Sequence, residues 1–254
     1  LPAEGGQDAQ AMLAAGLKAY VLIGVEPEFD CAAPSVAAQA LAGAGFVVAL
    51  SSYLGGTVER EADVVLPVAT YVETSGTFVN LEGRWQDFQG AARAPGQARP
   101  GWKVLRVLGN LLGVAGFDYL SSADVAAEAR SATAGIAATN AVEAEPALTK
   151  VDGAALARIA EVPIYASDAI VRRAGALQAT PLAVTAEVRV NAAEAARLGL
   201  CAGGRAHVAQ GGGAAVVPVT IDDSIPDGCV WVPAGLEATG GLAAGAGPVE
   251  VRTA

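Results

Sequence analysis

The sequence predicts an α/β protein in which a Rossmann-like half-domain with a parallel sheet is followed by a small β-barrel. Apolar runs of strand length alternate with Ala-rich helical stretches through residues 8–66, as in βαβ units. Short alternating strands with Gly and Pro turns fill residues 184–253. The predicted parts are an α/β domain over residues 1–113, a linker with short helices over 114–180 and the barrel over 181–254.

The first part is predicted to begin with a helix over residues 8–18. Three apolar runs of strand length follow, at residues 20–25, 46–50 and 63–66. Continuous apolar strands are typical of a parallel sheet that is covered on both faces. Between them we expect a helix that opens at Pro34 with Ser35 as its N-cap, and a short helix over 58–62. Pro67 lacks the N–H that a ladder needs, so it ends the third strand.

Two helices are predicted after this α/β repeat. Residues 102–112 carry apolar side chains at helical spacing, and this stripe is expected to face the core. A short Ala-rich helix follows, for which Ser122 or Asp124 can act as the N-terminal cap. Residues 131–150 contain few large apolar side chains, which favours a surface loop or linker.

The segment before the barrel is predicted to be helical over residues 152–161 and extended over 162–165. Ser167 is expected to cap another helix, which ends in Arg172 and Arg173. Adjacent arginines are usually solvated, and binding of a partner is the alternative role for this pair.

The barrel is predicted from several short strands and one well-specified helix. Its strands are expected at residues 184–190, 205–210, 214–221, 229–233 and 249–253. The helix has Asn191 as its N-cap, Glu194 at the capping-box position and Gly199 just past its end. Short strands of this kind close into a barrel more readily than they form a free sheet.

Composition excludes several classes of function. The formal net charge of −10 argues against nucleic acid or an anionic membrane surface as a partner, since both require clustered Lys and Arg. No apolar run is long enough to span a bilayer. Cys31, Cys201 and Cys229 lie far apart, which is not the spacing of iron–sulfur or structural zinc ligands. His207, the single histidine, lies in an alternating strand pattern, where a structural role is expected rather than catalysis.

The candidate site follows the strand at residues 63–66, because ligands gather beyond the carboxyl ends of parallel strands. Glu73, Asn80, Glu82 and Arg84 are the candidate cofactor-binding residues. They could donate to and accept from a pterin or a nucleotide. Alternatively, Arg84 pairs with Glu73 or Glu82, while Asn80 satisfies carbonyl groups of a turn. A second candidate is the sequence Gly-Gly-Thr at residues 55–57, which could turn backbone amides toward a phosphate or be a simple turn.

Residues 62–86 resemble the end of the molybdopterin oxidoreductase domain through ADVVLP and then E-x-S-G-T-F-V-N-x-E-G-R-x-Q. The sequence of this segment is most similar to the large iron–sulfur subunit of bacterial NADH-quinone oxidoreductase. The segment at residues 164–180, IYASDAIVRRAGALQAT, resembles the same subunit. N-x-x-E-A-A-R-L-G-L at residues 191–200 resembles the start of the dinucleotide-binding barrel of the same superfamily, which implies a double-psi-like fold. Family members that bind the pterin dinucleotide tend to have Asn-Pro where this chain has Glu26 and Pro27.

The resemblance implies the C-terminal part of a respiratory complex I subunit that carries electrons from NADH toward quinone. This part would be a non-catalytic scaffold with no cofactor of its own: iron–sulfur clusters are expected upstream, and molybdopterin binding is expected to be lost. Expected partners are other peripheral-arm subunits, on the cytoplasmic face of the bacterial inner membrane and without membrane insertion. The alternatives are the cofactor-binding end of a catalytic molybdopterin oxidoreductase and an independent binding module.

Overall fold

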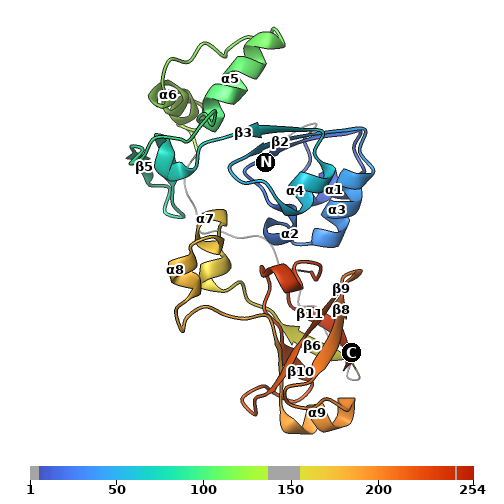
Figure 1. Ribbon diagram of the computed structural model, residues 1–254. Helices are drawn as coiled ribbons and strands as arrows, with labels where there is room; N and C mark the ends of the chain where they lie inside the picture. The colour runs from blue at the N-terminus through green and yellow to red at the C-terminus, as the bar shows by residue number, and fades with distance from the viewer. Residues whose placement is uncertain (1–5, 137–154, 244) are drawn as a thin grey trace.

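A computed structural model describes residues 6–136, 155–243 and 245–254 of the chain. Figure 1 shows a parallel sheet with its helices near one end and a β-barrel at the other. A helical arm projects beside the sheet, and short helices lie between the sheet and the barrel. Within the described residues, every helix is too short or too polar to cross a membrane.

The parallel sheet has the strand order β1-β2-β3. Its strands are β1 (Ala19–Ile23), β2 (Phe46–Ser51) and β3 (Val64–Pro67). The helices around it are α1 (Ala9–Ala14), α2 (Pro27–Asp30), α3 (Pro34–Ala42) and α4 (Gly56–Glu61). Val48 of β2 pairs with Val21 of β1 and with Val64 of β3, so the strands run in register. The predicted parallel sheet of alternating strands and helices is confirmed, and Pro67 is the last residue of β3.

One face of the sheet is covered. Tyr20, Leu41 and Val47 form its buried core, and Leu13 and Leu17 from the region of α1 pack against them. The opposite face is covered only in part, because Val21, Ile23 and Phe46 are exposed whereas Leu50 is fully buried. The expectation of a sheet covered on both faces therefore holds for only part of the second face among the described residues.

Ser35 is not the N-cap of α3. Ala33 occupies that position and Pro34 is the first helical residue, where its missing N–H costs nothing. The Ser35 hydroxyl instead donates to the carbonyl oxygen of Gly211 in the barrel at 2.8 Å. A residue with a capping preference thus serves as a contact between the two parts of the chain.

A hairpin and a helical arm follow the sheet. They consist of the 3-10 turn η1 (Tyr71–Glu73), β4 (Gly76–Val79), β5 (Trp85–Phe88), α5 (Gly101–Leu111) and α6 (Ser122–Ala132). The apolar stripe of α5 is half-buried at Trp102, Leu105 and Leu108, and only its end is exposed, with Leu111 at 80%. Gly109 is the one buried residue of the helix. The cap of α6 is Ser121, and Asp124 accepts from the Ser121 N–H in a capping box.

Six strands form the closed barrel in the order β10-β6-β11-β8-β9-β7. They are β6 (Leu156–Ile159), β7 (Val188–Val190), β8 (Arg205–Gln210), β9 (Gly213–Ile221), β10 (Cys229–Trp231) and β11 (Gly247–Thr253). The predicted barrel is confirmed. The helix predicted over residues 152–161 is wrong for its described part, because β6 pairs with β10 on one side and β11 on the other. The barrel therefore takes a strand from the segment that was predicted to be a linker.

Arg158 of β6 is the largest fully buried side chain of the structure. Its guanidinium donates to the carbonyl oxygens of Val232 and Pro233, each at 2.9 Å, to the carbonyl oxygen of Ala243, and to Oε1 of Gln210 at 2.7 Å. Burial lowers the pKa of Arg158 to about 10, so the side chain still carries its proton at neutral pH. This arginine ties the start of the barrel to the loops that follow β10.

The barrel helix α9 (Ala192–Leu198) begins and ends as predicted. Asn191 accepts from the Glu194 N–H at 2.8 Å, and Gly199 adopts the left-handed conformation with φ of 68°. Glu194 does not close a capping box. Its carboxylate accepts from the Gly228 N–H at 3.1 Å, which holds the helix to the turn before β10.

Three short helices connect the two parts of the chain. The 3-10 turn η2 (Ile164–Ala166) replaces the extended segment predicted over residues 162–165, and α7 (Ala169–Arg172) and α8 (Gly175–Gln178) follow it. The cap of α7 is Asp168 rather than Ser167, since the Asp168 carboxylate accepts from the Ile170 and Val171 amides. The barrel contributes one more turn near this junction, η3 (Glu237–Thr239).

Candidate functional site

Three of the four predicted site residues, Asn80, Glu82 and Arg84, lie in the turn between β4 and β5, and Glu73 lies in the 3-10 turn η1 before this hairpin. Glu73 accepts from the Thr70 N–H at 2.9 Å and stabilises η1. Oδ1 of Asn80 accepts from the amides of Glu82 and Arg84 at 3.1 and 2.9 Å. The structure therefore brings Asn80, Glu82 and Arg84 together in one turn and leaves Glu73 apart from them.

Local interactions account for these side chains. Nη2 of Arg84 lies 3.6 Å from Oε2 of Glu82, and both side chains are exposed, so the pair contributes about 0–1 kcal/mol. Of the two pairings considered for Arg84, the structure shows the one with Glu82. Asn80 satisfies amide groups of the turn rather than carbonyl groups. Gly83 has φ of 75°, which a side chain would strain.

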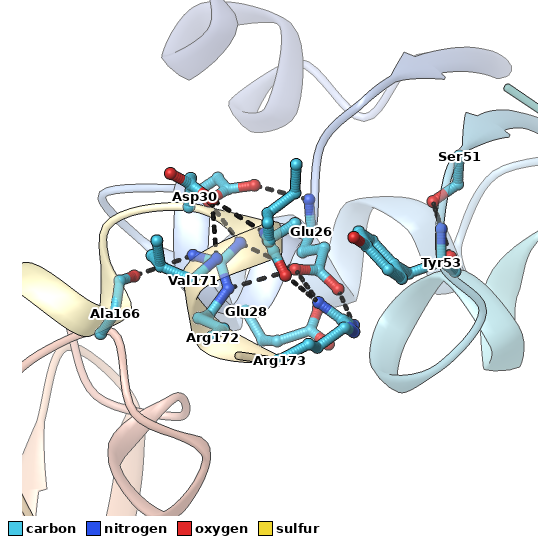
Figure 2. A network of polar contacts seen from close by, with 12 residues as sticks. Glu26, Glu28, Asp30, Ser51, Tyr53, Ala166, Val171, Arg172 and Arg173 are labelled. Atoms are coloured by element: carbon cyan, nitrogen blue, oxygen red, sulfur yellow. Dashed lines mark hydrogen bonds and ion pairs between the residues drawn. The ribbon is translucent and has the colours of Figure 1, made fainter. Parts of the chain in front are cut away.

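A denser cluster of charges lies at the carboxyl end of β1, around Glu26 (Figure 2). Glu26 is 8% exposed and receives two arginines from the end of α7. Oε2 of Glu26 lies 2.7 Å from Nη2 of Arg172 and 3.0 Å from Nη1 of Arg173, and Oε1 accepts from Nη2 of Arg173. We call Glu26, Arg172 and Arg173 the clasp, because they join the sheet to the segment that leads into the barrel.

Neighbouring groups hold the clasp in place. Nη2 of Arg172 also lies 3.2 Å from Oδ1 of Asp30, whose other oxygen accepts from the Glu26 N–H at 2.7 Å. The guanidinium of Arg172 lies 4.8 Å from the ring centre of Phe29, and that of Arg173 lies 4.1 Å from the ring centre of Tyr53. Such cation–π contacts favour a fixed orientation of each arginine.

The clasp perturbs the ionisation of its carboxyl group. Burial acts to raise the pKa of Glu26, but the hydrogen bonds and charges of Arg173 and Arg172 outweigh it and hold the pKa below the ordinary value of 4.5. The hydrogen bond with Glu26 in turn raises the pKa of Arg173. Glu26 is therefore ionised at neutral pH.

The clasp should weaken in acid. A carboxyl group with a lowered pKa stabilises the folded chain fully above pH 4.5, and this contribution is lost as the pH falls through the folded pKa. We expect the unfolding free energy of the wild-type chain to decrease more steeply below pH 4.5 than that of Glu26→Gln. Denaturant titrations at several pH values measure both slopes, and other carboxyl groups cancel in the comparison. Equal slopes would contradict an ionised, paired Glu26.

A cavity of about 470 Å³ lies beside the clasp, between α2 and α4 on one side and η3 of the barrel on the other. Glu26, Glu28 and Glu237 contribute three carboxylates to its lining, against the guanidinium groups of Arg60 and Arg173. A second cavity of about 520 Å³ lies at the carboxyl ends of the strands and is lined mainly by apolar groups, among them Ile23, Tyr53, Val68, Tyr71, Phe78 and Ile170.

Glu28 occupies the position at which the Gly-Gly-Thr sequence could have faced a phosphate. Its Oε1 accepts from the Thr57 N–H at 3.3 Å, and its Oε2 is buried without a hydrogen-bond partner among the described residues. A Cβ atom at Gly56 would lie 1.6 Å from Oε1 of Glu28 and would displace this carboxylate, and the φ of 55° at Gly56 also favours glycine.

Comparison with known proteins places the first part of the chain in a family. Residues 2–111 match the family model described as Molybdopterin oxidoreductase. These residues are a molybdopterin oxidoreductase domain. Over 97 residues the chain is 44% identical to the NADH-quinone oxidoreductase G subunit of Mycobacterium tuberculosis, an alignment that covers 37% of this chain and 12% of the relative. The chain thus spans only a small part of the length of the curated relatives that it matches.

Other relatives extend the same picture. Over 53 residues the chain is 53% identical to the mitochondrial NADH-ubiquinone oxidoreductase 78 kDa subunit of Neurospora crassa, covering 21% of this chain and 7% of that one. It is 31% identical over 120 residues to the assimilatory nitrate reductase catalytic subunit of Bacillus subtilis, covering 47% and 17%. The fold is similar to acetylene hydratase from Pelobacter acetylenicus, with a TM-score of 0.66, 14% identity, and coverage of 96% of this chain and 46% of that chain.

The family name of this molybdopterin oxidoreductase domain implies a pterin cofactor, and the clasp region does not fit an anionic dinucleotide. Glu28 and Glu237 line the cavity beside the paired Glu26, and their carboxylates repel a phosphate. Glu28 already uses the Thr57 amide, which a phosphate would otherwise need. Within residues 6–136, 155–243 and 245–254, no group of three or more His, Cys, Asp or Glu could hold a metal ion.

Sequence reasoning missed the role of the two arginines. Arg172 and Arg173 lie 146 and 147 residues from Glu26, a separation at which no local pattern signals contact. The signal that could have found them was chemical: a glutamate placed just after a buried strand needs a cation when the chain folds. Adjacent arginines elsewhere in the sequence were the candidate partners.

Proposed function

We propose that this chain is the C-terminal region of an iron–sulfur subunit of the NADH-quinone oxidoreductase type and acts there as a scaffold without redox chemistry of its own. The observation that carries the proposal is the clasp, in which the carboxylate of Glu26 is neutralised by the chain's own arginines. The motif at residues 62–86 and the identity to NADH-quinone and NADH-ubiquinone oxidoreductase subunits support the choice of enzyme.

In this proposal, the cavity between the α/β part and the barrel contains no cofactor. Arg173 brings positive charge to the lining of this cavity, as a phosphate site would require, but its guanidinium is paired with the carboxylate of Glu26. We propose that iron–sulfur clusters in the rest of the subunit carry the electrons, with other peripheral-arm subunits as partners on the cytoplasmic face of the inner membrane. We also propose a double-psi arrangement of the barrel, which the parallel pairs β6–β10 and β7–β9 support.

The alternative is the cofactor-binding end of a catalytic molybdopterin oxidoreductase. The 31% identity to the nitrate reductase catalytic subunit, over a longer alignment than the match to the mycobacterial NADH-quinone oxidoreductase, favours this alternative. The three carboxylates around the cavity disfavour it.

Metal and pterin analysis of the native assembly separates the two functions. The protein is purified in its native complex, and molybdenum and pterin are measured against iron and NADH oxidation. We expect iron and NADH-oxidising subunits to co-purify, with molybdenum and pterin far below one per complex. A nitrate reductase purified in parallel is the positive control. Stoichiometric molybdenum would establish the catalytic alternative, and purification without NADH-oxidising subunits would favour an independent binding module.

A further inference from the structure

Glu28 carries the one carboxylate oxygen that is buried without a hydrogen-bond partner among the described residues. The residue lies in α2, beside the clasp (Figure 2). Its Oε1 accepts from the Thr57 N–H at 3.3 Å, whereas its Oε2 receives no donor. Native proteins leave few buried polar atoms unsatisfied, and a charged acceptor is the most costly of them. Oε2 of Glu28 therefore has the capacity to accept a hydrogen bond from a ligand.

The cavity of about 470 Å³ supplies the space for such a ligand. Glu28 lines it from α2, and the exposed Glu237 lines it from η3 of the barrel. The turn after η3 packs closely on α2, because a Cβ atom at Gly240 would lie 3.4 Å from the carbonyl oxygen of Glu28. Four glycines in the lining bring the backbone to the cavity without side chains: Gly55, Gly56, Gly240 and Gly241. Both walls of the cavity thus belong to this chain.

The cations in the lining do not neutralise these two carboxylates. Arg173 pairs with Glu26, and Arg60, whose side chain is 61% exposed, lies 3.8 Å from the glutamate that follows it in α4. In the part of the chain that the structure describes, no salt bridge of this region includes Glu28 or Glu237. The cavity therefore has two carboxylates whose charge is uncompensated by an ion pair.

An aliphatic ammonium group fits this lining. Anions are repelled by the two carboxylates, and no group of three possible metal ligands exists within the described ranges. A guanidinium binds best to both oxygens of a carboxylate, but Oε1 of Glu28 already accepts from the Thr57 amide. An ammonium is a compact charge that needs one oxygen only. Phe29, Pro34 and Ala38 give the same cavity an apolar surface for methylene groups.

We propose that the cavity binds a linear aliphatic diamine or polyamine. One ammonium group donates to Oε2 of Glu28 and a second pairs with Glu237, while the methylene chain between them lies against the apolar part of the lining. The net charge of −10 favours the approach of a polycation. Such a ligand performs no redox chemistry, so the proposal goes beyond the scaffold function and does not depend on it. It would join the α/β part to the barrel beside the clasp.

Equilibrium dialysis with radiolabelled 1,4-diaminobutane tests the site. Native assemblies are purified with the wild-type chain, with Glu28→Gln or with Glu82→Gln, and binding is measured at physiological ionic strength. We expect saturable binding by the wild type and a Kd raised at least about tenfold by Glu28→Gln, because a hydrogen bond between charged groups is lost. Glu82→Gln removes the same charge from the exposed hairpin turn and should leave the Kd unchanged.

A second variant and a second probe keep the test decisive if Glu28→Gln does not assemble. Glu237 is exposed, so Glu237→Gln should fold normally. We expect it to weaken binding of 1,4-diaminobutane and to leave binding of butylamine, which has one ammonium group, unchanged. Absence of saturable diamine binding by the wild type, or equal affinity of wild type and both cavity variants, would overturn the proposal. These outcomes involve neither molybdenum nor NADH oxidation, so they are distinct from failure of the proposed function.

Discussion

Glu26→Gln is expected to lower the unfolding free energy of the chain by about 3–5 kcal/mol, the typical cost of removing one partner from a buried ion pair. The substitution preserves the volume of the side chain but leaves Arg172, whose side chain is 10% exposed, beside a neutral amide. Asp30 compensates only in part, because it contacts one of the two arginines. Chemical denaturation of wild type and variant measures the difference.

The matched control is Glu82→Gln. It removes the same charge from an exposed pair with Arg84, for which the expected loss is below about 1 kcal/mol. The double variant Glu26→Gln with Arg172→Met tests the coupling, since the second substitution should recover part of the loss. If Glu26→Gln and Glu82→Gln unfold alike, the clasp does not hold the two parts of the chain together.

Arg158→Leu is expected to destabilise the barrel by roughly 3–5 kcal/mol. The substitution leaves the buried carbonyl oxygens of Val232, Pro233 and Ala243 without donors, and each unsatisfied group costs about 1–3 kcal/mol. Removal of a buried charge that faces no carboxylate offsets part of this cost. Thermal unfolding measures the effect, followed by tryptophan fluorescence in a chain whose Trp85 and Trp102 are replaced by Phe, so that the signal comes from Trp231 in the adjacent strand β10.

Two comparisons make the Arg158 prediction specific. Arg252→Leu changes an exposed arginine of the same barrel and should shift stability by less than about 0.5 kcal/mol. Arg158→Lys keeps the charge but not the planar fork of donors, so it should fall between wild type and Arg158→Leu. A barrel that tolerates Arg158→Leu as well as Arg252→Leu would refute the structural role of the buried guanidinium.

The sequence could predict which residue types of the candidate site matter, but not which of these residues contact one another. The sequence identified Glu73, Asn80, Glu82 and Arg84 through their density in one loop, and the structure shows them holding that loop. It also identified Glu26 as a departure from the Asn-Pro that family members binding the pterin dinucleotide tend to have. The pairing of Glu26 with Arg172 and Arg173 could not be predicted, because their contact depends on how the segment before the barrel returns to the end of β1.

The sequence by itself determined the elements whose signals are local. Apolar runs specified β1, β2 and β3, Pro67 specified where β3 ends, and Asn191 with Gly199 specified the limits of α9. In each case the residues that decide the structure are neighbours along the chain, so composition and spacing are sufficient.

Tertiary structure alone decided the elements whose partners are distant. Residues 156–159 form a strand because their backbone groups pair with β10 on one side and β11 on the other. Those two strands lie about seventy to ninety residues further along the chain. The apolar stripe of α5 is half-buried along most of its length and exposed only at Leu111 and Leu112. Ser35 reaches the barrel instead of capping its helix. Contacts across long sequence separations form only when the whole chain folds, and no short window of sequence contains both partners.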